Sequence, residues 1–324
     1  MSRHSDLVKI KGTNLEVSRL GLGTAALGGL FTSVDERDGD DLIYAAFENG
    51  INFFDTAPLY GYGNAEIRLG RALKEASKPY VLETKVGRVL NPTENADIGW
   101  FADANPKLEP VFDFSADGVK RSIEESLKRL QVDHIDIALL HEADDHLRDA
   151  IEKAYPVLDS LRSQGVIKGI GMGLNWSAPS VTILKECDLN VSLIAGRYTL
   201  LDQEAQDELF PLAMKKNCSI LIAGVYNSGV LANPNPGAYY DYLPASDEII
   251  SRARKIGEFF KARNVSLTAA ALQYPLRHPA VTMVLTGSRS RQELLSNIED
   301  FNSDIPTSVW DELEASGLVK EFKA

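Results

Sequence analysis

Residues 50–70 read GINFFDTAPLYGYGNAEIRLG, and this stretch decides the fold class. Its short, mainly apolar run, Ile51–Asp55, predicts a strand, and Ala65–Glu75 predicts a helix. The glycines between the two segments favour a tight turn. A strand that turns into a helix is the unit of parallel βα folds, so the same order is expected elsewhere in the chain.

That order recurs about eight times along the 324 residues. Strands are expected at Leu20–Gly23, Ile51–Asp55, Tyr80–Lys85, Ile135–His141, Ile167–Met172, Val191–Ala195, Ser219–Ala223 and Val281–Leu285. Helices are expected at Asp40–Asn49, Ala65–Glu75, Ser115–Leu130, Ala150–Gln164, Ser177–Lys185, Glu204–Asn217, Asp247–Asn264, Ser266–Arg277 and Arg291–Phe301. With a hairpin over Val8–Ser18, we predict an α/β fold: a single (β/α)8 TIM barrel, one domain over residues 1–324. A doubly wound open sheet is the alternative, but residues 21–28 lack the glycine spacing of its dinucleotide-binding turn.

Two long loops, residues 86–114 and 224–244, follow the third and seventh predicted strands. Loops of this length in a compact domain are usually functional, and in a barrel they overhang the active face. Their aromatic residues are candidates for the walls of a substrate pocket, or equally for anchors of the loops. These residues are Trp100, Phe101, Phe112, Phe114, Tyr239, Tyr240 and Tyr242.

The composition limits the class of partner. The chain has 34 Lys and Arg against 46 Asp and Glu, a formal net charge of −12, which disfavours nucleic acid and anionic membranes. Cys187 and Cys218 are the only cysteines, so a reduced compartment is expected. The polar N-terminus and the lack of a long apolar run predict no signal peptide and no membrane span. We expect a cytoplasmic monomer or homodimer whose partner is a small-molecule substrate.

Polar residues stand at the carboxyl ends of successive predicted strands, where barrel enzymes hold their catalytic groups. Asp55 ends the second strand, with Tyr60 five residues later; Lys85 ends the third, His141 ends the fourth and Asn175 follows the fifth. Each has a structural alternative: a turn or cap for Asp55, packing for Tyr60, a solvated strand end for Lys85 and a core position for His141. Their occurrence together favours a catalytic site.

Asp55, Tyr60, Lys85 and His141 together are typical of a proton-transfer site. An unperturbed tyrosine has a pKa of about 10. We expect Lys85 to lower the pKa of Tyr60, Asp55 to hold Lys85 in place, and His141 to orient a substrate oxygen. Such a site moves protons but cannot itself move a hydride, so a nicotinamide is implied. The five histidines form no metal-binding motif, and no metal is expected.

These motifs resemble the aldo-keto reductase superfamily over essentially the whole chain. Residues 21–24 (GLGT) resemble its G-x-G-T, and residues 55–70 match its D-T-A-x-x-Y-G-x-G-x-[SA]-E-x-x-L-G signature almost position for position. Residues 83–85 (ETK) and 139–141 (LLH) supply the lysine and histidine of the family, and residues 286–291 (TGSRSR) resemble the segment that holds the adenosine portion of the cofactor. The resemblance implies that Asp55, Tyr60, Lys85 and His141 form the catalytic tetrad.

The resemblance also implies the cofactor contacts, which are Gly23, Thr24, Asp55, Asn175, Tyr226, Gly287, Ser288, Arg289, Glu293 and Asn297. Members that prefer NADP place a lysine and an arginine where Gly287 and Glu293 stand here, and a glutamate repels a 2′-phosphate. Arg289 is the counter-evidence. We predict NAD, with NADP less favoured. The serine expected before Asn175 and the glutamine expected at Ala195 are missing, and Tyr226 is the candidate for stacking on the nicotinamide.

Segments 27–31, 195–202 and 225–231 resemble the branch that contains D-threo-aldose (L-fucose) 1-dehydrogenases, L-galactose dehydrogenase and pyridoxal 4-dehydrogenase. That resemblance implies oxidation of a cyclic hemiacetal, an aldose or pyridoxal, to its lactone, with Tyr60 as the acid/base group. Two alternatives stay open: an NADPH-dependent aldehyde or ketone reductase, and a cofactor-sensing regulatory subunit with slow turnover. A non-redox barrel hydrolase is disfavoured by the missing metal ligands.

Overall fold

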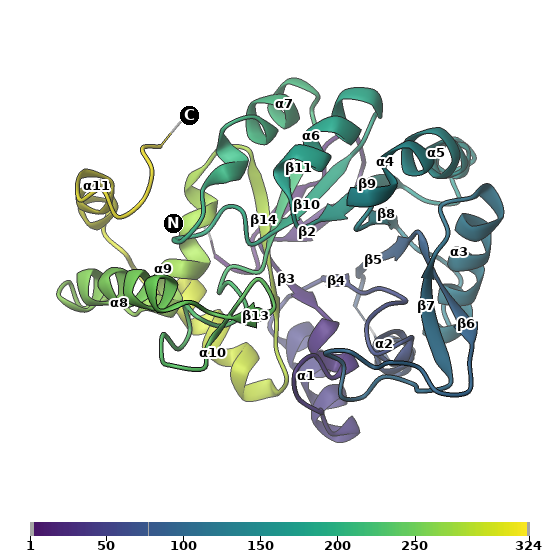
Figure 1. Cartoon of the computed structure of the whole chain (residues 1–324), viewed down its shortest axis with the longest axis horizontal. Helices are drawn as coiled ribbons and strands as arrows, with labels where there is room; N and C mark the ends of the chain where they lie inside the picture. The colour runs from purple at the N-terminus through teal and green to yellow at the C-terminus, as the bar shows by residue number, and fades with distance from the viewer. Residues whose placement is uncertain (1–2, 77, 323–324) are drawn as a thin grey trace.

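Eight parallel strands close into a barrel in the structure, a computed structural model that describes residues 3–76 and 78–322. Their order around the barrel is β3 (Leu20–Gly23), β4 (Phe53–Asp55), β5 (Val81–Val86), β8 (Ile137–His141), β9 (Gly169–Leu174), β10 (Val191–Ala195), β11 (Ser219–Ala223) and β14 (Val281–Gly287), which pairs with β3. Helices surround the strands (Figure 1). The predicted (β/α)8 barrel is confirmed.

The helices outside the barrel are α1 (Glu36–Glu48), α2 (Asn64–Leu73), α3 (Ala116–Leu130), α4 (Leu147–Asp149), α5 (Tyr155–Ser163), α6 (Ser177–Glu186), α7 (Leu209–Lys215), α8 (Asp247–Lys261), α9 (Leu267–Gln273), α10 (Arg291–Asn302) and α11 (Thr307–Ala315). A π-helical turn, η3 (Ala150–Ala154), joins α4 to α5. Short 3₁₀ turns are η1 (Ala25–Gly28), η2 (Asp144–His146), η4 (Glu204–Gln206) and η5 (Tyr274–Arg277).

Some helix boundaries differ from the sequence prediction. Helix α1 begins four residues earlier than expected because the side chain of Asp35 accepts a hydrogen bond from the backbone N–H of Arg37 and caps the helix. The helix expected over Glu204–Asn217 is divided into η4 and α7. Pro211 lies in the first turn of α7, where a missing N–H is tolerated, so the helix starts anew there. Helix α11 was not predicted.

Both long loops contain antiparallel hairpins that the sequence prediction left as irregular chain. In the first loop, β6 (Arg88–Pro92) pairs with β7 (Leu108–Phe112), and Figure 1 shows this hairpin beside α3. In the second loop, β12 (Tyr239–Tyr240) pairs with β13 (Leu243–Pro244). The prolines at the ends of β6 and β13 read as turn signals in the sequence, which hid the strands.

The inside of the barrel is an apolar core separate from the layer between strands and helices. It contains Phe53, Val81, Ile137, Leu139, Val191, Leu193, Leu221, Met283 and Leu285. The N-terminal hairpin, β1 (Leu7–Lys9) with β2 (Glu16–Ser18), adds Ile10, Leu15 and Val17 to the same cluster. Because the hairpin packs on residues from the barrel interior, it closes the amino-terminal end, and polar side chains can gather only at the carboxyl end.

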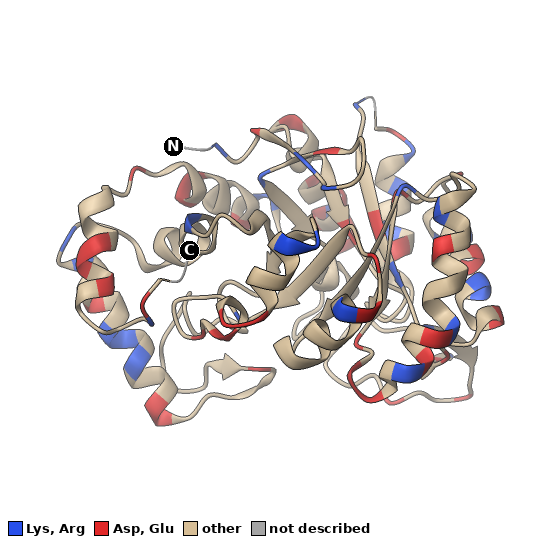
Figure 2. Ribbon diagram, turned by 90° about the horizontal axis from the view of Figure 1, so that it is seen from above, with Lys and Arg blue, Asp and Glu red and all other residues tan. Residues whose placement is uncertain are grey.

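Charged residues are interspersed along the outer helices and loops, with acidic and basic positions alternating on several of them (Figure 2). The ion pairs there include Arg263, just after α8, with Glu312 on α11. Among the residues that the structure describes, no helix is both long enough and apolar enough to cross a membrane.

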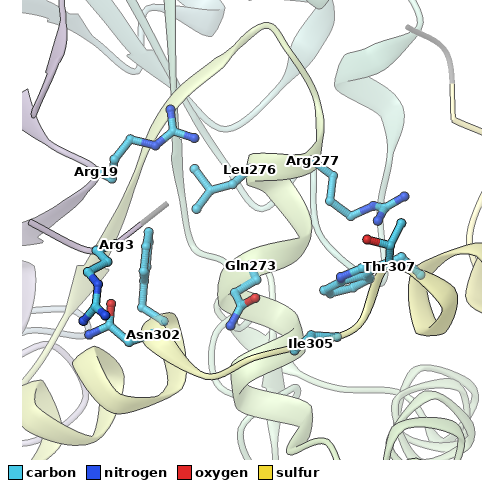
Figure 3. Close-up of a pocket in the computed structure, with 10 residues that line it drawn as sticks. Arg3, Arg19, Gln273, Leu276, Arg277, Asn302, Ile305 and Thr307 are labelled. Atoms are coloured by element: carbon cyan, nitrogen blue, oxygen red, sulfur yellow. The ribbon is translucent and has the colours of Figure 1, made fainter. Parts of the chain in front are cut away.

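A cavity of about 450 Å³ lies between η5, α10 and the start of α11 (Figure 3). Arg19 and Arg277 line it and precede β3 and β14, so it lies toward the amino-terminal end of the barrel. Arg277 is paired with Glu314, and Arg19 donates to the carbonyl oxygen of Thr282. Residues at the amino-terminal end of such a barrel usually contribute to stability, whereas active sites lie at the carboxyl-terminal end. The candidate site is therefore sought at the carboxyl-terminal end.

Candidate active site

The alternation of side chains along three strands aims the predicted polar residues into the barrel. Successive residues of a strand point to opposite faces, so Asp55 shares a face with Phe53, and His141 shares one with Leu139. Phe53 and Leu139 belong to the interior core, and Lys85 follows Val81 of the same core by four residues. Asp55 and His141 therefore each cap an apolar residue at the carboxyl end, and Lys85 follows Val81 and Glu83 on the inward face of β5.

Asp55 and Lys85 form a buried ion pair. Lys85 Nζ also donates to the carbonyl oxygen of Thr56 at 2.9 Å and lies 4.7 Å from the centre of the Tyr60 ring. Lys85 is 1% exposed and Asp55 is 5% exposed. The ammonium group is thus fixed beside the phenol by two acceptors, the predicted Asp55 and the carbonyl oxygen of Thr56, which was not predicted.

The turn after β4 positions Tyr60. Its ring centre lies 5.9 Å from that of His141, edge-on, and 6.1 Å from that of Phe101. Gly28 approaches this turn so closely that a Cβ on it would lie 2.6 Å from the carbonyl carbon of Tyr60. Gly61 needs glycine as well, because its φ is +62°. The glycines of the motif thus serve the close approach that holds the tyrosine.

The electrostatic setting of Tyr60 differs from the prediction that Lys85 lowers its pKa. Burial raises the pKa of Tyr60 well above its ordinary value, and the negative charge of Asp55 raises it further, followed by Tyr242 and Glu142. The reason is that Lys85 is already neutralised by Asp55, so the buried phenol experiences mainly the carboxylates around it. Ionisation of Tyr60 therefore requires alkaline conditions or an added positive charge.

His141 is a neutral imidazole at neutral pH. Burial lowers its pKa well below the ordinary value, and the cations of Lys85 and Arg88 lower it further. It is 4% exposed, and Nδ1 has no hydrogen-bond partner among the described residues. A neutral ring can donate one hydrogen bond to an oxygen placed beside Tyr60.

Asn175 lies just after β9 and is held by a residue that the sequence analysis did not consider. Its Nδ2 donates to Glu142 Oε1 at 3.0 Å, and Glu142 is also paired with Arg88. The backbone carbonyl of Asn175 accepts a hydrogen bond from Arg197 Nε at 2.8 Å. Asn175 is therefore fixed at both its amide and its backbone at the rim of the site.

The predicted cofactor residues after β11 and in the last βα unit form two hydrogen-bonded groups. Tyr226 donates its hydroxyl to Asn297 Oδ1 at 2.8 Å, and Asn297 Nδ2 donates to Ser288 Oγ at 3.1 Å. Arg289 pairs with Glu293 at 3.1 Å, and Glu293 also accepts from the backbone N–H of Arg289 at 2.8 Å. The charge of Arg289, the counter-evidence against NAD, is thus balanced within the chain.

Strand β3 lies between the cofactor residues that follow β14 and Asp55 on β4. Gly23 lies opposite Asp55 on one side and Gly287 on the other. The hydroxyls of Thr24 and Thr286 are buried and have no hydrogen-bond partner among the described residues. Together with Ser288 and Asn175, they are polar groups suited to an extended polar ligand such as a dinucleotide. Within the same described ranges, no group of three or more His, Cys, Asp and Glu could hold a metal.

Aromatic residues from three loops stack in pairs, and one of them, Tyr242, is close enough to Tyr60 to affect its pKa. Phe31, after η1, stacks on Tyr239 with ring centres 5.1 Å apart, and Trp100 stacks on Tyr242 at 5.6 Å. We call Phe31, Trp100, Tyr239 and Tyr242 the aromatic roof. Of the other aromatic candidates, Phe101 contacts Tyr60, Tyr240 packs on the outer core, and Phe112 and Phe114 stack on each other and on His146. That these residues line a substrate pocket stays a prediction.

Arg197 fixes the second loop to the barrel. It pairs with Asp241 through Nη2 at 2.9 Å and Nη1 at 3.1 Å, and its guanidinium lies 4.0 Å from the ring centre of Trp176. Ala195 lacks the expected amide, and Arg197, two residues later, was not among the predicted site residues. An arginine directly after a buried strand was the available signal. Glu83, two residues before Lys85 on the same face, was also not among the predicted site residues. The available signal was a carboxylate within a buried strand.

The chain is similar to known proteins over most of its length. The sequence profile described as the Aldo/keto reductase family matches residues 19–317. Pyridoxal 4-dehydrogenase from Microbacterium luteolum is 41% identical over 330 aligned positions, covering 95% of this chain and 96% of the relative. D-threo-aldose 1-dehydrogenase from a Pseudomonas species is 36% identical, covering 94% and 95%. A solved aldo-keto reductase from Bacillus halodurans, in its holo form, superposes with a TM-score of 0.78 at 26% identity, covering 98% of this chain and 97% of that one.

Proposed function

The chain belongs to the aldo/keto reductase family and is an oxidoreductase, and from this premise we propose that it oxidises a cyclic hemiacetal to a lactone with NAD. The substrate class comprises aldoses such as L-fucose or L-galactose, and pyridoxal. The observation that carries the proposal is the juxtaposition of Tyr60, His141 and the Asp55–Lys85 pair under the aromatic roof.

The chain's residues perform the proton transfer. A bound nicotinamide supplies the chemistry that the chain lacks, because it accepts a hydride from carbon. Tyr60 Oη, once ionised, takes the proton of the hemiacetal hydroxyl as the C–H bond breaks, and the C–O bond becomes the lactone carbonyl. Neutral His141 donates a hydrogen bond that orients the same oxygen. Lys85 keeps a positive charge beside the phenol ring.

Residues around β14 would hold the cofactor. Ser288, Asn297 and Tyr226 offer a connected set of hydroxyl and amide groups, and Asn175 offers an amide on the opposite side. Glu293 supports NAD over NADP because its carboxylate neutralises Arg289, the cation that would otherwise face a 2′-phosphate. The choice of NAD rests on this pair and on Gly287.

The aromatic roof supports a ring-shaped substrate. Its stacked pairs, Phe31 with Tyr239 and Trp100 with Tyr242, present flat apolar surfaces from separate loops. The interplanar angles of 25° and 29° leave the rings nearly parallel within each pair. Both a pyranose and a pyridine ring pack on such surfaces.

The experiment is an assay of purified protein with NAD or NADP against L-fucose, L-galactose and pyridoxal, with product analysis. We expect NADH and the lactone to form in equal amounts. The methyl glycoside of L-fucose is a matched control, because it keeps the ring but has no anomeric hydroxyl proton. NADPH-dependent aldehyde reduction without hemiacetal oxidation would overturn the proposal in favour of a reductase. Tight cofactor binding with negligible turnover of every substrate would favour the regulatory alternative.

A further inference from the structure

Glu83 is a buried carboxyl inside the barrel that the tetrad leaves unused. It is 0% exposed, shares a strand face with Lys85, and lies opposite Asp55 in the pairing of β4 with β5. Neither of its carboxyl oxygens accepts a hydrogen bond from any described residue. Lys85, the nearest cation on the strand, directs its Nζ to Asp55 and Thr56 instead.

Glu66 shows how this chain otherwise accommodates a fully buried glutamate. It is also 0% exposed, but Oε1 accepts from the hydroxyl of Thr84 at 3.0 Å and Oε2 pairs with Arg129 at 2.6 Å. A carboxylate is retained there because a cation and a donor compensate its charge. Glu83 has neither, and an unpaired buried carboxylate is costly enough that the group takes up a proton.

A protonated Glu83 faces an acceptor, the Asp55 side chain, across the pairing of β4 with β5. Two facing carboxyl groups can form a hydrogen bond only when one of them carries a proton. Burial raises the pKa of Glu83 well above its ordinary value, and both the charge of Asp55 and a hydrogen bond with Asp55 raise it further against the opposing effect of Lys85. The geometry and the chemistry therefore agree on a neutral Glu83.

We propose that Glu83 is a positioning residue that donates its proton in a hydrogen bond to Asp55, and so weakens the negative field that Asp55 exerts on Tyr60. Asp55 is the charged group with the largest effect on Tyr60. Sharing a proton with Glu83 spreads the charge of Asp55 away from the phenol, which leaves more of the field of Lys85 to stabilise a phenolate. The inference rests on the proposed function only in taking Tyr60 as the proton acceptor.

The pH dependence of the site must include every titratable or charged group around Tyr60. These groups are Asp55 on β4, Glu83 and Lys85 on β5, His141 and Glu142 at the end of β8, and Tyr242 in the second loop. Arg88, on β6, is paired with Glu142 and faces His141. Only Glu83 in this set is both fully buried and without a hydrogen-bond donor directed at it.

The test compares Glu83→Leu with Glu83→Gln in the pH profile of kcat/KM. Leucine removes the donor, so we expect the pH at which Tyr60 ionises to rise by about one unit, a tenfold loss of oxidation at a fixed pH on that limb. Glutamine keeps an N–H donor to Asp55, and its profile is expected to coincide with that of the wild type. A downward shift in Glu83→Leu would mean that Glu83 is charged, and an unmoved limb would mean that it is merely structural; either overturns the inference.

A second measurement needs no substrate. The infrared spectrum of the wild type at neutral pH is expected to contain the C=O band of a protonated carboxylic acid, which disappears in Glu83→Gln and persists in Glu66→Gln. Absence of the band, or its persistence in Glu83→Gln, overturns the inference even if Glu83→Leu fails to fold. Should the protein prove to be a reductase, this band and the same shift in the reduction profile still test Glu83, so the two failures remain distinguishable.

Discussion

Replacing Asp241 by asparagine tests how the second loop is held over the site. Arg197 is buried, with its side chain 3% exposed, whereas the side chain of Asp241 is 34% exposed. Asp241 and its neighbour Tyr242 have φ values of +49° and +62°, in the left-handed region. Tyr242 belongs to the aromatic roof, so the ion pair and the strained turn together decide whether the roof is in place.

The effect of Asp241→Asn on the free energy of loop docking can be worked out from these contacts. A left-handed non-glycine residue costs about 1–2 kcal/mol, so the turn opposes docking by about 2–4 kcal/mol. The bidentate pair compensates part of this cost. Three features reduce the cost of the substitution below that of breaking a fully buried ion pair. Asparagine keeps one acceptor, Asp202 remains 3.6 Å from Arg197, and position 241 is partly solvated. We therefore expect the substitution to cost about 1–2 kcal/mol. The closed loop is then expected to lose about a factor of 5–30 in population relative to the open loop.

Limited proteolysis and steady-state kinetics measure this change. Asp241→Asn is expected to be cleaved faster within residues 232–244 and to show a raised KM, with kcat altered less because the tetrad is untouched. Glu312→Gln is the control, since it breaks the exposed pair with Arg263 between outer helices. Equal cleavage and equal KM in Asp241→Asn and the wild type would refute the reasoning.

Three further changes probe the cofactor end, the tyrosine turn and the phenol. Glu293→Gln releases Arg289, so NADP is expected to bind about fivefold tighter with NAD little changed, measured by fluorescence titration; an unchanged ratio of the two dissociation constants contradicts the assigned pair. Gly28→Ala places a Cβ 2.5 Å from Gly61 N, so a stability loss of about 1–3 kcal/mol in urea and a lower kcat are expected; wild-type values would disprove the close approach. Because the pKa of Tyr60 is raised, kcat/KM for oxidation is expected to increase with pH above about pH 7. A value of kcat/KM that stays constant above about pH 7 would contradict the raised pKa.

The sequence predicted the barrel because the alternation of strands and helices is repeated and periodic, and β3, β10 and β11 match their predicted ranges. It also placed Asp55, Tyr60, Lys85 and His141 together, because the carboxyl ends of parallel strands meet at one edge. The predicted direction of the Tyr60 pKa shift was wrong, because Lys85 was expected to lower the pKa and burial raises it. That direction depends on burial and on charges from Glu142 and Tyr242, which are distant in sequence.

The sequence did not predict residues whose role depends on a partner far away in the chain. Arg197 and Asp241 are 44 positions apart and belong to different loops, so no local pattern connects them. The hairpins β6–β7 and β12–β13 have prolines and short strands that resemble irregular chain. Glu83 could have been singled out, because a carboxylate in an otherwise buried strand is unusual, but its lack of a partner is visible only once the barrel is closed.

The most direct test of the central claim, that Tyr60 transfers the proton of a hemiacetal hydroxyl, is single-turnover NADH formation by Tyr60→Phe. Phenylalanine keeps the ring between His141 and Phe101 and removes only the hydroxyl. We predict an NAD dissociation constant equal to that of the wild type and a rate of hydride transfer lower by about 10²–10⁴. A rate within a few-fold of the wild type, with the same lactone product, would contradict the assignment.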